Sequence, residues 1–536
     1  TGAGDNDRRD IARYAATSGN AQIFAPFNQM FQGIEFANIC IDNIPKMDMY
    51  SGGSDQQKKQ LQRMYGEALT LRAQFYLEAI RNWGDLPANF QPAAVLALSN
   101  PFPVKVGRDT LYDHLLDDLK TAEGLVPWRN ELTAIGDVID ERITKASVKG
   151  LRARIALYRG GYSLRGAGPG FGTMARSSDY LKYYQIAKDE CTDIMASGQH
   201  SLNPSYKALW KDQVCAHAVS DPNGELIFQA SAIGQASAED TKLGYYNGPT
   251  VNALGNKSVN VLPNYFYLFD STDLRRDVTC VPYIVGADGV TKTGQAITAI
   301  CDGKYRRDWI TNPTILPTNA IQYFSLKWQL IRYADILLMY AEAENELNGP
   351  TATAYDAINQ VRRRGYGKPI STADATVDLS GLSKVTFFQA LVRERALEFG
   401  GEGIRKYDLI RWNLLAAAIA TSKVNMLNMS NLTPMVNPTY MAPYPAYALT
   451  ANLPIAMYYI TGSTADDKAL WKNSFYVTAP TSTPAGTTKV TWLSAGINTT
   501  ALSRYATGFT TGKSELLPIS QQSRDANFNL AQNPGY

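Results

Sequence analysis

The sequence has few of the residues that metal and thiol chemistry require. Its 536 residues include three histidines and five cysteines, and no two cysteines stand in a CxxC pair. Structural zinc sites take closely spaced Cys and His ligands, so the sequence argues against a metal site. Isolated cysteines are typical of buried thiols, with a Cys280–Cys301 disulfide as the alternative. We therefore predict neither a metal nor a cofactor.

Long apolar runs and an excess of either charge are also missing. No stretch approaches 18 consecutive apolar residues, so the sequence predicts no transmembrane helix. There are 52 basic and 49 acidic residues without a basic stripe or tail, which argues against nucleic-acid binding. Aromatic residues are abundant instead, with 31 Tyr and eight Trp. Such side chains suit surfaces that are partly wet and partly apolar.

Amphipathic helical periodicity dominates both ends of the chain. In residues 57–83, QKKQLQRMYGEALTLRAQFYLEAIRNW, apolar side chains recur every three or four positions, and Gly84 and Pro87 end the pattern. Alanines such as Ala334 and Ala341 suit close contacts between helices. Further helices are predicted at about 27–45, 108–123, 144–159, 179–197, 328–348, 351–364, 384–400 and 404–420. The predicted fold class is mainly α, a scaffold of tetratricopeptide-like helix hairpins.

Two regions lack this periodicity. Between about 198 and 327, short apolar runs such as GELIFQAS read as strands, and residues 422–514 are rich in Thr, Ser, Pro, Asn and Tyr. We interpret both as irregular, partly β insertions, because long ordered loops usually carry function. The predicted single domain, 1–536, comprises an N-terminal helical part (27–197), an insertion with the candidate ligand site (198–327), C-terminal helix hairpins (328–421) and a loop-rich C-terminal part (422–536).

The densest run of paired charge is VRERALEFGGEGIRKYDLIRW, residues 392–412. It is either an active site or a structural clamp. A hydrolase needs two carboxylates that face each other across a cleft with separated pKa values. Here arginines are in reach, with Arg395–Glu398 and Arg405–Asp408 at i,i+3, and such neighbours depress carboxylate pKa values. We predict a clamp between packed helices, no catalytic residues and no enzymatic activity.

Two other patterns are also assigned to structure rather than chemistry. The glycine-rich stretch 158–172 follows a predicted helix rather than a strand and lacks GK[ST], so we expect a loop at the rim of a pocket and not a phosphate loop. Asp273 beside Arg275 and Arg276 predicts an ion pair that fixes a loop.

Six segments in the chain, taken in order, resemble the SusD/RagB family. Their order, their spacing and the terminal NPGY make the resemblance specific, and the matches run from about residue 27 to the last residue. The segments are EALTLRAQFYLEAIRNWGDLP (67–87), KASVKGLRARIALYRGG (145–161), LIRYADILLMYAEAENELNG (330–349), AINQVRRRGYG (357–367), residues 392–412, and LLPISQQSRDANFNLAQNPGY (516–536).

The resemblance implies a scaffold of about four tetratricopeptide-like helix pairs with loop insertions. It also implies a surface-exposed outer-membrane lipoprotein of Bacteroidetes, used in polysaccharide utilization. Such proteins capture oligo- or polysaccharide, or peptides in the RagB branch, and partner a SusC-type TonB-dependent transporter. The family's anchor is a lipid on an N-terminal cysteine, which this chain, opening TGAGDNDRRD, does not contain.

No short motif fixes the sugar-binding residues, so their choice rests on chemistry. Pyranose rings stack on Tyr and Trp, and sugar hydroxyls need planar partners such as Arg, Asn and Asp. In relatives, the site combines the loop after the early helix with the middle insertion. Core packing is the alternative for each aromatic residue. The predicted ligand-binding residues are Arg81, Trp83, Asp85, Asn89, Phe90, Tyr245, Tyr246, Asn247, Tyr283, Tyr305, Arg306 and Trp309.

Three other functions stay open beside glycan capture. A peptide-capturing protein of the RagB type would share the fold, and the small net charge does not discriminate between the two. A glycoside hydrolase would use acids such as Glu394 or Glu402, against the clamp hypothesis. A scaffold protein would bind only its transporter partner.

Overall fold

The computed structural model describes residues 8–140, 142–166, 168–218, 220–232, 241–311, 318 and 320–536. Within them, long helices form a series in which successive members pack together as four pairs. This arrangement confirms the predicted mainly α, helix-hairpin fold class. In chain order the helices are α2 (Ala21–Asn43), α4 (Asp55–Trp83), α6 (Arg108–Glu123), α7 (Lys145–Arg159), α8 (Tyr180–Ala196), α13 (Tyr333–Asn348), α14 (Ala352–Gly365) and α15 (Lys384–Glu398).

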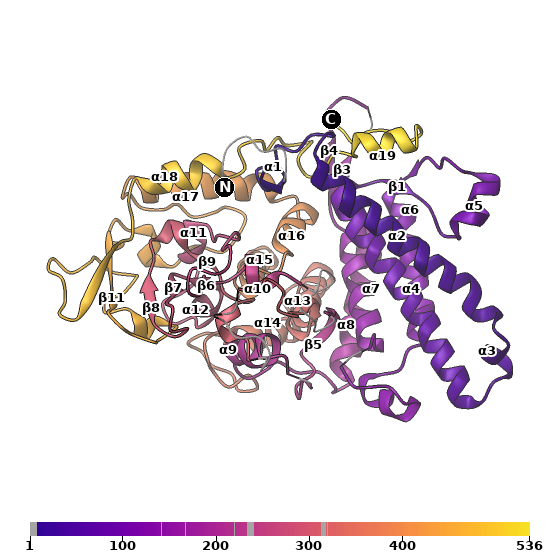
Figure 1. The fold of residues 1–536 in the computed structure, drawn as a ribbon, viewed down its shortest axis with the longest axis horizontal. Helices are drawn as coiled ribbons and strands as arrows, with labels where there is room; N and C mark the ends of the chain where they lie inside the picture. The colour runs from indigo at the N-terminus through magenta and orange to yellow at the C-terminus, as the bar shows by residue number, and fades with distance from the viewer. Residues whose placement is uncertain are drawn as a thin grey trace.

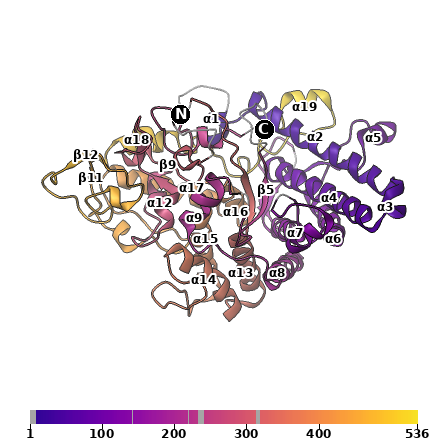
Figure 2. The ribbon, with the colours of Figure 1, turned by 60° about the horizontal axis from the view of Figure 1, so that its bottom comes forward.

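The chain places its N-terminal helices at one end of the molecule and its insertions at the other. Figures 1 and 2 show α2, α4 and α6 at one end, with strands β11 (Ala456–Ile460) and β12 (Thr487–Thr491) at the opposite end. In Figure 1, the N-terminal α1 (Arg8–Ala12) lies on the same upper edge as the C-terminal α18 (Gly496–Thr500). Segments from both ends of the sequence therefore share one edge of the fold.

Local sequence sets both ends of α4, the longest of these helices. Ser54 precedes it, and its hydroxyl accepts a hydrogen bond from the backbone N–H of Gln57 in a capping box. The helix ends at Trp83 because Gly84 takes a φ of 76°, a conformation that favours glycine. The predicted end of this helix is confirmed.

The predicted helix 328–348 is wrong over its first five residues. These residues, WQLIR, form strand β10 (Trp328–Arg332), which pairs antiparallel with β5 (Leu226–Ala230), and α13 begins only at Tyr333. Gln329 and Ile331 are buried whereas Trp328 and Leu330 are half-buried, which is the alternation of a strand. The segment GELIFQAS is a strand as predicted.

The predicted helix 404–420 is two helices. α16 (Arg405–Arg411) ends before Asn413, which has a φ of 58°, and α17 (Leu415–Ser430) follows. A left-handed residue breaks the helical hydrogen-bond pattern, so the two segments diverge. α17 also continues past residue 421, because Met426 and Met429 are buried in the core.

Strands occur as two-stranded antiparallel sheets in the described residues. They lie mostly in the insertions, as predicted. Besides β5–β10 and β11–β12, the pairs are β1 (Leu86–Pro87) with β2 (Lys105–Val106), β3 (Ser163–Arg165) with β4 (Thr173–Ala175), β6 (Cys280–Val281) with β9 (Cys301–Asp302), and β7 (Tyr283–Val285) with β8 (Lys292–Gly294).

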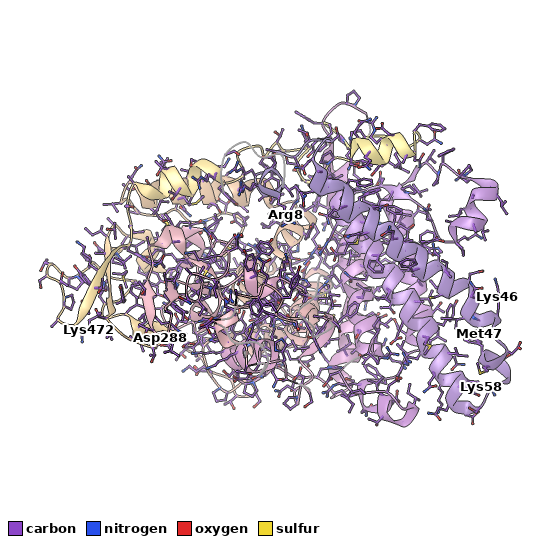
Figure 3. All side chains as sticks on the ribbon, in the orientation of Figure 1. Arg8, Lys46, Met47, Lys58, Asp288 and Lys472 are labelled. Atoms are coloured by element: carbon purple, nitrogen blue, oxygen red, sulfur yellow. The ribbon has the colours of Figure 1, made fainter. Side chains whose placement is uncertain are left out.

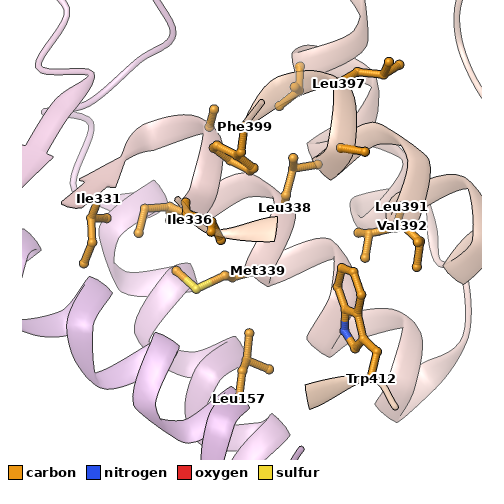
Figure 4. Close-up of a cluster of buried hydrophobic side chains, with 14 of the residues drawn as sticks. Leu157, Ile331, Ile336, Leu338, Met339, Leu391, Val392, Leu397, Phe399 and Trp412 are labelled. Atoms are coloured by element: carbon orange, nitrogen blue, oxygen red, sulfur yellow. The ribbon is translucent and has the colours of Figure 1, made fainter. Parts of the chain in front are cut away.

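The largest core lies between the helices of the scaffold. Figure 4 shows Leu157 of α7 facing Met339 of α13, with Leu391 of α15 nearby. The predicted alanines Ala334 and Ala341 have no exposed surface, as close helix contact requires. A second cluster, which we call the insertion core, packs separately; its buried members are Tyr206, Leu209, Trp210, Val214, Cys215, Val278, Tyr305, Trp309, Ile310, Phe324 and Leu326.

A buried network of ion pairs joins the insertion to the C-terminal hairpins. Glu398 of α15 accepts from Arg364 of α14 at 2.6 Å and from Arg275 of the insertion at 3.1 Å. Because these partners belong to different parts of the chain, the pairs fix the insertion on the hairpin. The arginine–carboxylate network comprises residues that are at most 3% exposed: Glu225, Arg275, Lys304, Arg332, Arg364, Glu394, Glu398 and Glu402.

The predicted clamp is confirmed, but its partners differ from those expected. Arg395 pairs with Asp408 at 2.8 Å and with Asp335 at 2.7 Å, not with Glu398. Arg405 donates to a backbone carbonyl of α15 at 2.8 Å and not to Asp408. Each predicted pair does lie within one helix, but the partners of Arg395, Asp335 of α13 and Asp408 of α16, come from other helices that only the fold brings next to it. The predicted loop-fixing pair Asp273–Arg275 is present at 2.8 Å.

Burial and neighbouring charge act in opposite directions on the carboxylates of the network. Burial alone would raise the pKa of Glu398, but the guanidinium groups of Arg364, Arg332 and Arg275 outweigh it and lower the pKa to about 2. Burial prevails at Glu225, whose pKa is raised despite Arg364 and Arg332. The predicted depression therefore holds for Glu398, whereas Glu225 lies outside the segment 392–412 for which it was predicted.

The five cysteines are free thiols. Four are buried, as predicted, and Cys40 is exposed. Cys280 and Cys301 lie on the paired strands β6 and β9, where Cys301 stands opposite Val281. None of the helices in the described part of the chain combines the length and the hydropathy needed to cross a membrane.

Removing the central charge of the network should destabilise the fold. Glu398→Gln leaves buried guanidinium groups without their carboxylate, and breaking a buried pair costs about 3–5 kcal/mol in the free energy of unfolding. Denaturant titration followed by circular dichroism measures this loss. Asp117→Asn, which changes an exposed carboxylate of α6, is the control and should shift stability by less than about 0.5 kcal/mol. Equal losses in the two variants would contradict the clamp.

The effect of Glu398→Gln should also depend on pH. The folded pKa of Glu398 lies below its ordinary value of 4.5, so its ionisation stabilises the fold above that pH, and this stabilisation is lost as the pH falls towards 2. The stability difference between the wild-type chain and Glu398→Gln should therefore shrink below about pH 4.5. A difference that stays constant down to the acid limit of folding would show that Glu398 is not held ionised.

Candidate functional site

The predicted residues at the end of α4 are tied into the scaffold. Trp83 is buried, and its indole nitrogen donates to the carbonyl of Pro518 at 3.2 Å. The guanidinium of Arg81 pairs with Glu78 and lies 4.1 Å from the ring centroid of Tyr407. Both side chains therefore have partners that hold the C-terminal segment and α16 against α4.

Three predicted residues follow around β1. Asp85 has a side chain that is 34% exposed and accepts from Nε of Arg108 at 2.7 Å. Partial burial opposes ionisation of Asp85, but Arg108 prevails and lowers its pKa. The ring of Phe90 stacks on His114 with centroids 3.6 Å apart. Asn89 is half-buried, and its carbonyl accepts from an asparagine of α2. These three residues keep some contact with solvent.

The predicted residues Tyr283, Arg306 and Trp309 form a buried stack in the insertion. The guanidinium carbon of Arg306 lies 4.0 Å from the ring centroid of Trp309 and 5.3 Å from that of Tyr283. Arg306 also pairs with Asp308, and the indole nitrogen of Trp309 donates to Asp466 at 3.1 Å. The three predicted side chains are at most 4% exposed, so they offer no open face to a sugar in this structure.

Two more predicted residues are buried beside this stack. Tyr305 stacks on Trp328 with centroids 5.2 Å apart and donates to Gln329 at 2.8 Å. Asn247 donates its side-chain amide to Asp302 at 2.8 Å. Burial raises the pKa of Asp302 to about 6, against the opposing effect of that amide. Both residues hold the insertion together here, and a role in binding stays a prediction.

Tyr245 and Tyr246 are the predicted aromatic residues of the insertion that keep exposed surface. They lie on α10 (Leu243–Tyr246) with ring centroids 5.1 Å apart in a T-shaped contact, and both are half-buried. Figure 1 places α10 well apart from β1 at the end of α4. The fold therefore does not bring the two groups of predicted residues into one site.

An open cleft of about 390 Å³ lies beside α10, and we call it the α1 cleft. It is built by α1, the loop 256–262 of the insertion, and the segment that follows α18. Its volume falls in the range of small-molecule sites. The lining residues are Arg9, Ala12, Arg13, Asn256, Lys257, Ser258, Asn260, Val261, Leu262, Thr298, Thr500, Ala501, Arg504 and Tyr505.

Backbone hydrogen bonds join the walls of the α1 cleft to their surroundings. The N–H of Gly508 donates to the carbonyl of Arg13 at 3.0 Å, which connects α1 to the C-terminal segment. The N–H groups of Asn256 and Ser258 donate to the carbonyls of Tyr245 and Tyr246 at 2.7 and 2.9 Å. These two bonds attach the loop to α10. The guanidinium of Arg8 lies 6.0 Å from the ring of Tyr246, on the α1 side.

The loop that forms one wall of the cleft has an unusual backbone. Asn252, Ala253 and Lys257 have φ values of 50°, 60° and 49°, in the left-handed region that costs energy for residues with a side chain. Val261 anchors the loop end by donating to the carbonyl of Ile300 at 3.0 Å. Such strain clusters at ligand sites, because the surrounding structure has to impose it.

Sequence reasoning missed this cleft. The stretch NKSVN (256–260) is polar, follows Gly255 and the Tyr245–Tyr246 pair, and carried a usable signal. Residues 9–13 and 500–505 also line the cleft, but the sequence carried no signal for them. Only the fold brings together two segments that are so distant in the sequence. Among the described residues, no group of three or more His, Cys, Asp or Glu is placed to hold a metal ion.

Family models match both ends of the chain. Residues 316–536 match the model described as the SusD family. Residues 6–157 match the model described as starch-binding associating with outer membrane. SusD-like protein P38 of Formosa agariphila is 26% identical over 439 residues, which are 76% of this chain and 76% of that protein. SusD-like protein P25 of the same organism is 24% identical over 416 residues, 73% of this chain and 70% of that protein.

Solved structures share the whole fold. The crystal structure of a SusD homolog from Bacteroides thetaiotaomicron has a TM-score of 0.73 and 22% identity, and the match covers 100% of this chain and 90% of that one. Surface glycan-binding protein A from the same species, in complex with laminarihexaose, has a TM-score of 0.60 and 18% identity over 98% of this chain and 88% of that one. The two family models, the relatives and the shared fold agree that the chain belongs to the SusD/RagB family.

Proposed function

We propose that this chain is a non-catalytic, cell-surface glycan-binding protein that captures oligo- or polysaccharide and delivers it to a SusC-type TonB-dependent transporter of the outer membrane. Membership of the SusD/RagB family supports this proposal. So do two proteins of the same fold: the structure of one is in complex with laminarihexaose, and another is a laminarin-binding SusD-like protein. The N-terminal match to a family associated with the outer membrane supports the location.

The proposal rests on a difference in exposure: the α1 cleft is open, whereas the arginine–carboxylate network is buried. The cleft is open and is lined by amide, hydroxyl and cationic side chains, together with the apolar side chains of Val261 and Leu262. This mixture matches the hydroxyls and C–H faces of a sugar. Glu394 and Glu402, the acids that a hydrolase would use, are at most 3% exposed and belong to the arginine–carboxylate network. A glycosidic bond has no route to them in this structure.

Weak binding suits a protein that hands its ligand on. Each sugar hydroxyl exchanges a hydrogen bond to water for one to protein, so each contact gains little. A shallow cleft with one adjoining tyrosine pair should therefore bind with a Kd of about micromolar to millimolar, or very roughly −8 to −4 kcal/mol. Such affinity lets the transporter compete for the glycan.

Glycan binding is the direct test. The chain should bind members of a glycan array, and isothermal titration calorimetry should give a Kd in this range without release of reducing sugar. Tyr246→Ala should weaken binding by about fivefold to tenfold, since an aromatic stacking contact is worth about 1 kcal/mol. Its melting temperature should stay unchanged, because the ring is half-buried. Binding of mixed oligopeptides with no binding of any glycan would instead favour peptide capture, and turnover of glycan would favour a hydrolase.

Trp309→Ala should separate packing from binding. Trp309 is 4% exposed and holds Arg306 and Asp466 in place, so its removal should lower the free energy of unfolding by about 3–5 kcal/mol. Denaturant titration measures this loss, with Tyr246→Ala as the matched aromatic control at a half-buried position. If Trp309→Ala were as stable as the wild-type chain and failed to bind glycan, Trp309 would be a ligand contact rather than a core residue.

A further inference from the structure

The α1 cleft is lined by positive charge from three separate segments. Arg9 and Arg13 come from α1 and its end, Lys257 from the loop, and Arg504 from η8 (Leu502–Arg504). No Asp or Glu occurs among the described residues that line it. The whole chain has nearly equal numbers of basic and acidic residues, so this composition is a local feature of the cleft. Clefts lined by one sign of charge concentrate ligands of the opposite sign.

Lys257 and Arg504 differ from the basic residues of the interior. Within the described part of the chain, neither forms an ion pair with a carboxylate. Lys304, by contrast, lies 2.5 Å from Glu402, and Arg306 is paired with Asp308. Arg504 is exposed and Lys257 is half-buried, so both cationic groups can meet a ligand. Among the described carboxylates, therefore, none neutralises these two charges.

The remaining lining residues fit the rest of a sugar. Asn256, Ser258, Asn260 and Thr298 offer neutral donors and acceptors on one wall, next to the cation of Lys257. Val261 in the same loop gives an apolar surface for C–H groups. The left-handed backbone conformation of Lys257 sets the direction in which the loop continues after this residue. The cleft thus combines sugar-like complementarity with a net positive charge.

We infer that the α1 cleft selects acidic glycans, and that Lys257 and Arg504 bind a carboxylate or sulfate group carried by the sugar. This inference rests on the proposed function, because it names the class of glycan that the chain captures. Ionised acceptors make hydrogen bonds about twice as strong as neutral ones, and the planar guanidinium of Arg504 matches two oxygens of either group. A neutral glycan would leave both cations without a counter-charge and would gain only the weaker contacts.

The test compares oligosaccharides that differ only in charge. Calorimetry with tetragalacturonate and with its fully methyl-esterified form changes the carboxylate while keeping the sugar backbone. A sulfated carrageenan tetrasaccharide and its desulfated form change the sulfate in the same way, so the two pairs distinguish the two acidic groups. In at least one pair the acidic form should bind about tenfold more tightly, and this preference should weaken as NaCl rises from about 50 to 300 mM.

Matched variants test whether the preference for acidic glycans arises in the α1 cleft. Lys257→Gln and Arg504→Gln should each lower affinity for the preferred acidic form by about fivefold to tenfold, a clearly larger loss than for its neutral form, so that the ratio of the two affinities falls towards one. Lys472→Gln, at an exposed lysine that Figure 3 shows far from Arg8 of α1, is the charge control and should bind like the wild-type chain.

The outcomes separate this inference from the proposed function. Equal affinity for acidic and neutral forms would overturn the acidic preference while leaving glycan capture intact. A preference that survives in Lys257→Gln and Arg504→Gln would overturn its placement in the α1 cleft. Binding of an acidic peptide such as hexaglutamate, with no binding of any glycan on an array, would overturn both the inference and the proposed function.

Discussion

The buried pairing of arginines with carboxylates is the interaction on which the rest of the structure depends. Glu398 sits at the meeting point of Arg275 from the insertion, Arg332 from β10 and Arg364 from α14. The desolvation of these charges is costly, and only mutual pairing offsets it. The insertion therefore has one position on the hairpins in which every member of the network is paired. Apolar contacts alone would define the position of the insertion on the hairpins less specifically, because the helices of the scaffold present similar apolar faces.

This pairing separates the two tasks of the charged and aromatic residues. The acids of the network are committed to this pairing, and several large rings of the insertion are committed to packing: Tyr305 stacks on Trp328, and Trp309 lies against Arg306. Among the described residues of the insertion, Tyr246 and the loop 256–262 keep exposed surface on the outer rim, which is where we propose that recognition takes place. Because the insertion is fixed from below by the network, its rim can hold strained backbone at Ala253 and Lys257. The buried network thus supports the conformation of the exposed loop 256–262.

Local patterns in the sequence predicted most of the helical scaffold. The end of α4 at Gly84 follows from turn chemistry that is visible in the sequence. The strand Trp328–Arg332 was hidden because a strong helical pattern follows it directly and its pairing partner lies about 100 residues earlier in the chain. The clamp was predictable from charge density, but its pairs were not, since partners such as Asp335 belong to other helices and spacing along one helix does not show them.

The candidate site was much less accessible to sequence reasoning. Composition suggests that Tyr and Arg serve recognition. It does not show that Arg306 is enclosed by aromatic rings whereas Arg504 is exposed at the rim of the cleft. Burial is a property of the fold, and it divides residues of one chemical type into different roles. The α1 cleft further needs the chain ends, where Gly508 bonds to Arg13, and no spacing rule connects positions so far apart.

A crystal structure of the chain with a bound acidic oligosaccharide tests the central claim most directly. We expect sugar density in the α1 cleft, with its anionic group on Lys257 or Arg504, while Glu398 keeps its three arginine partners. Density for the sugar among the side chains of the arginine–carboxylate network, with Glu394 and Glu398 turned towards a glycosidic bond, would contradict it.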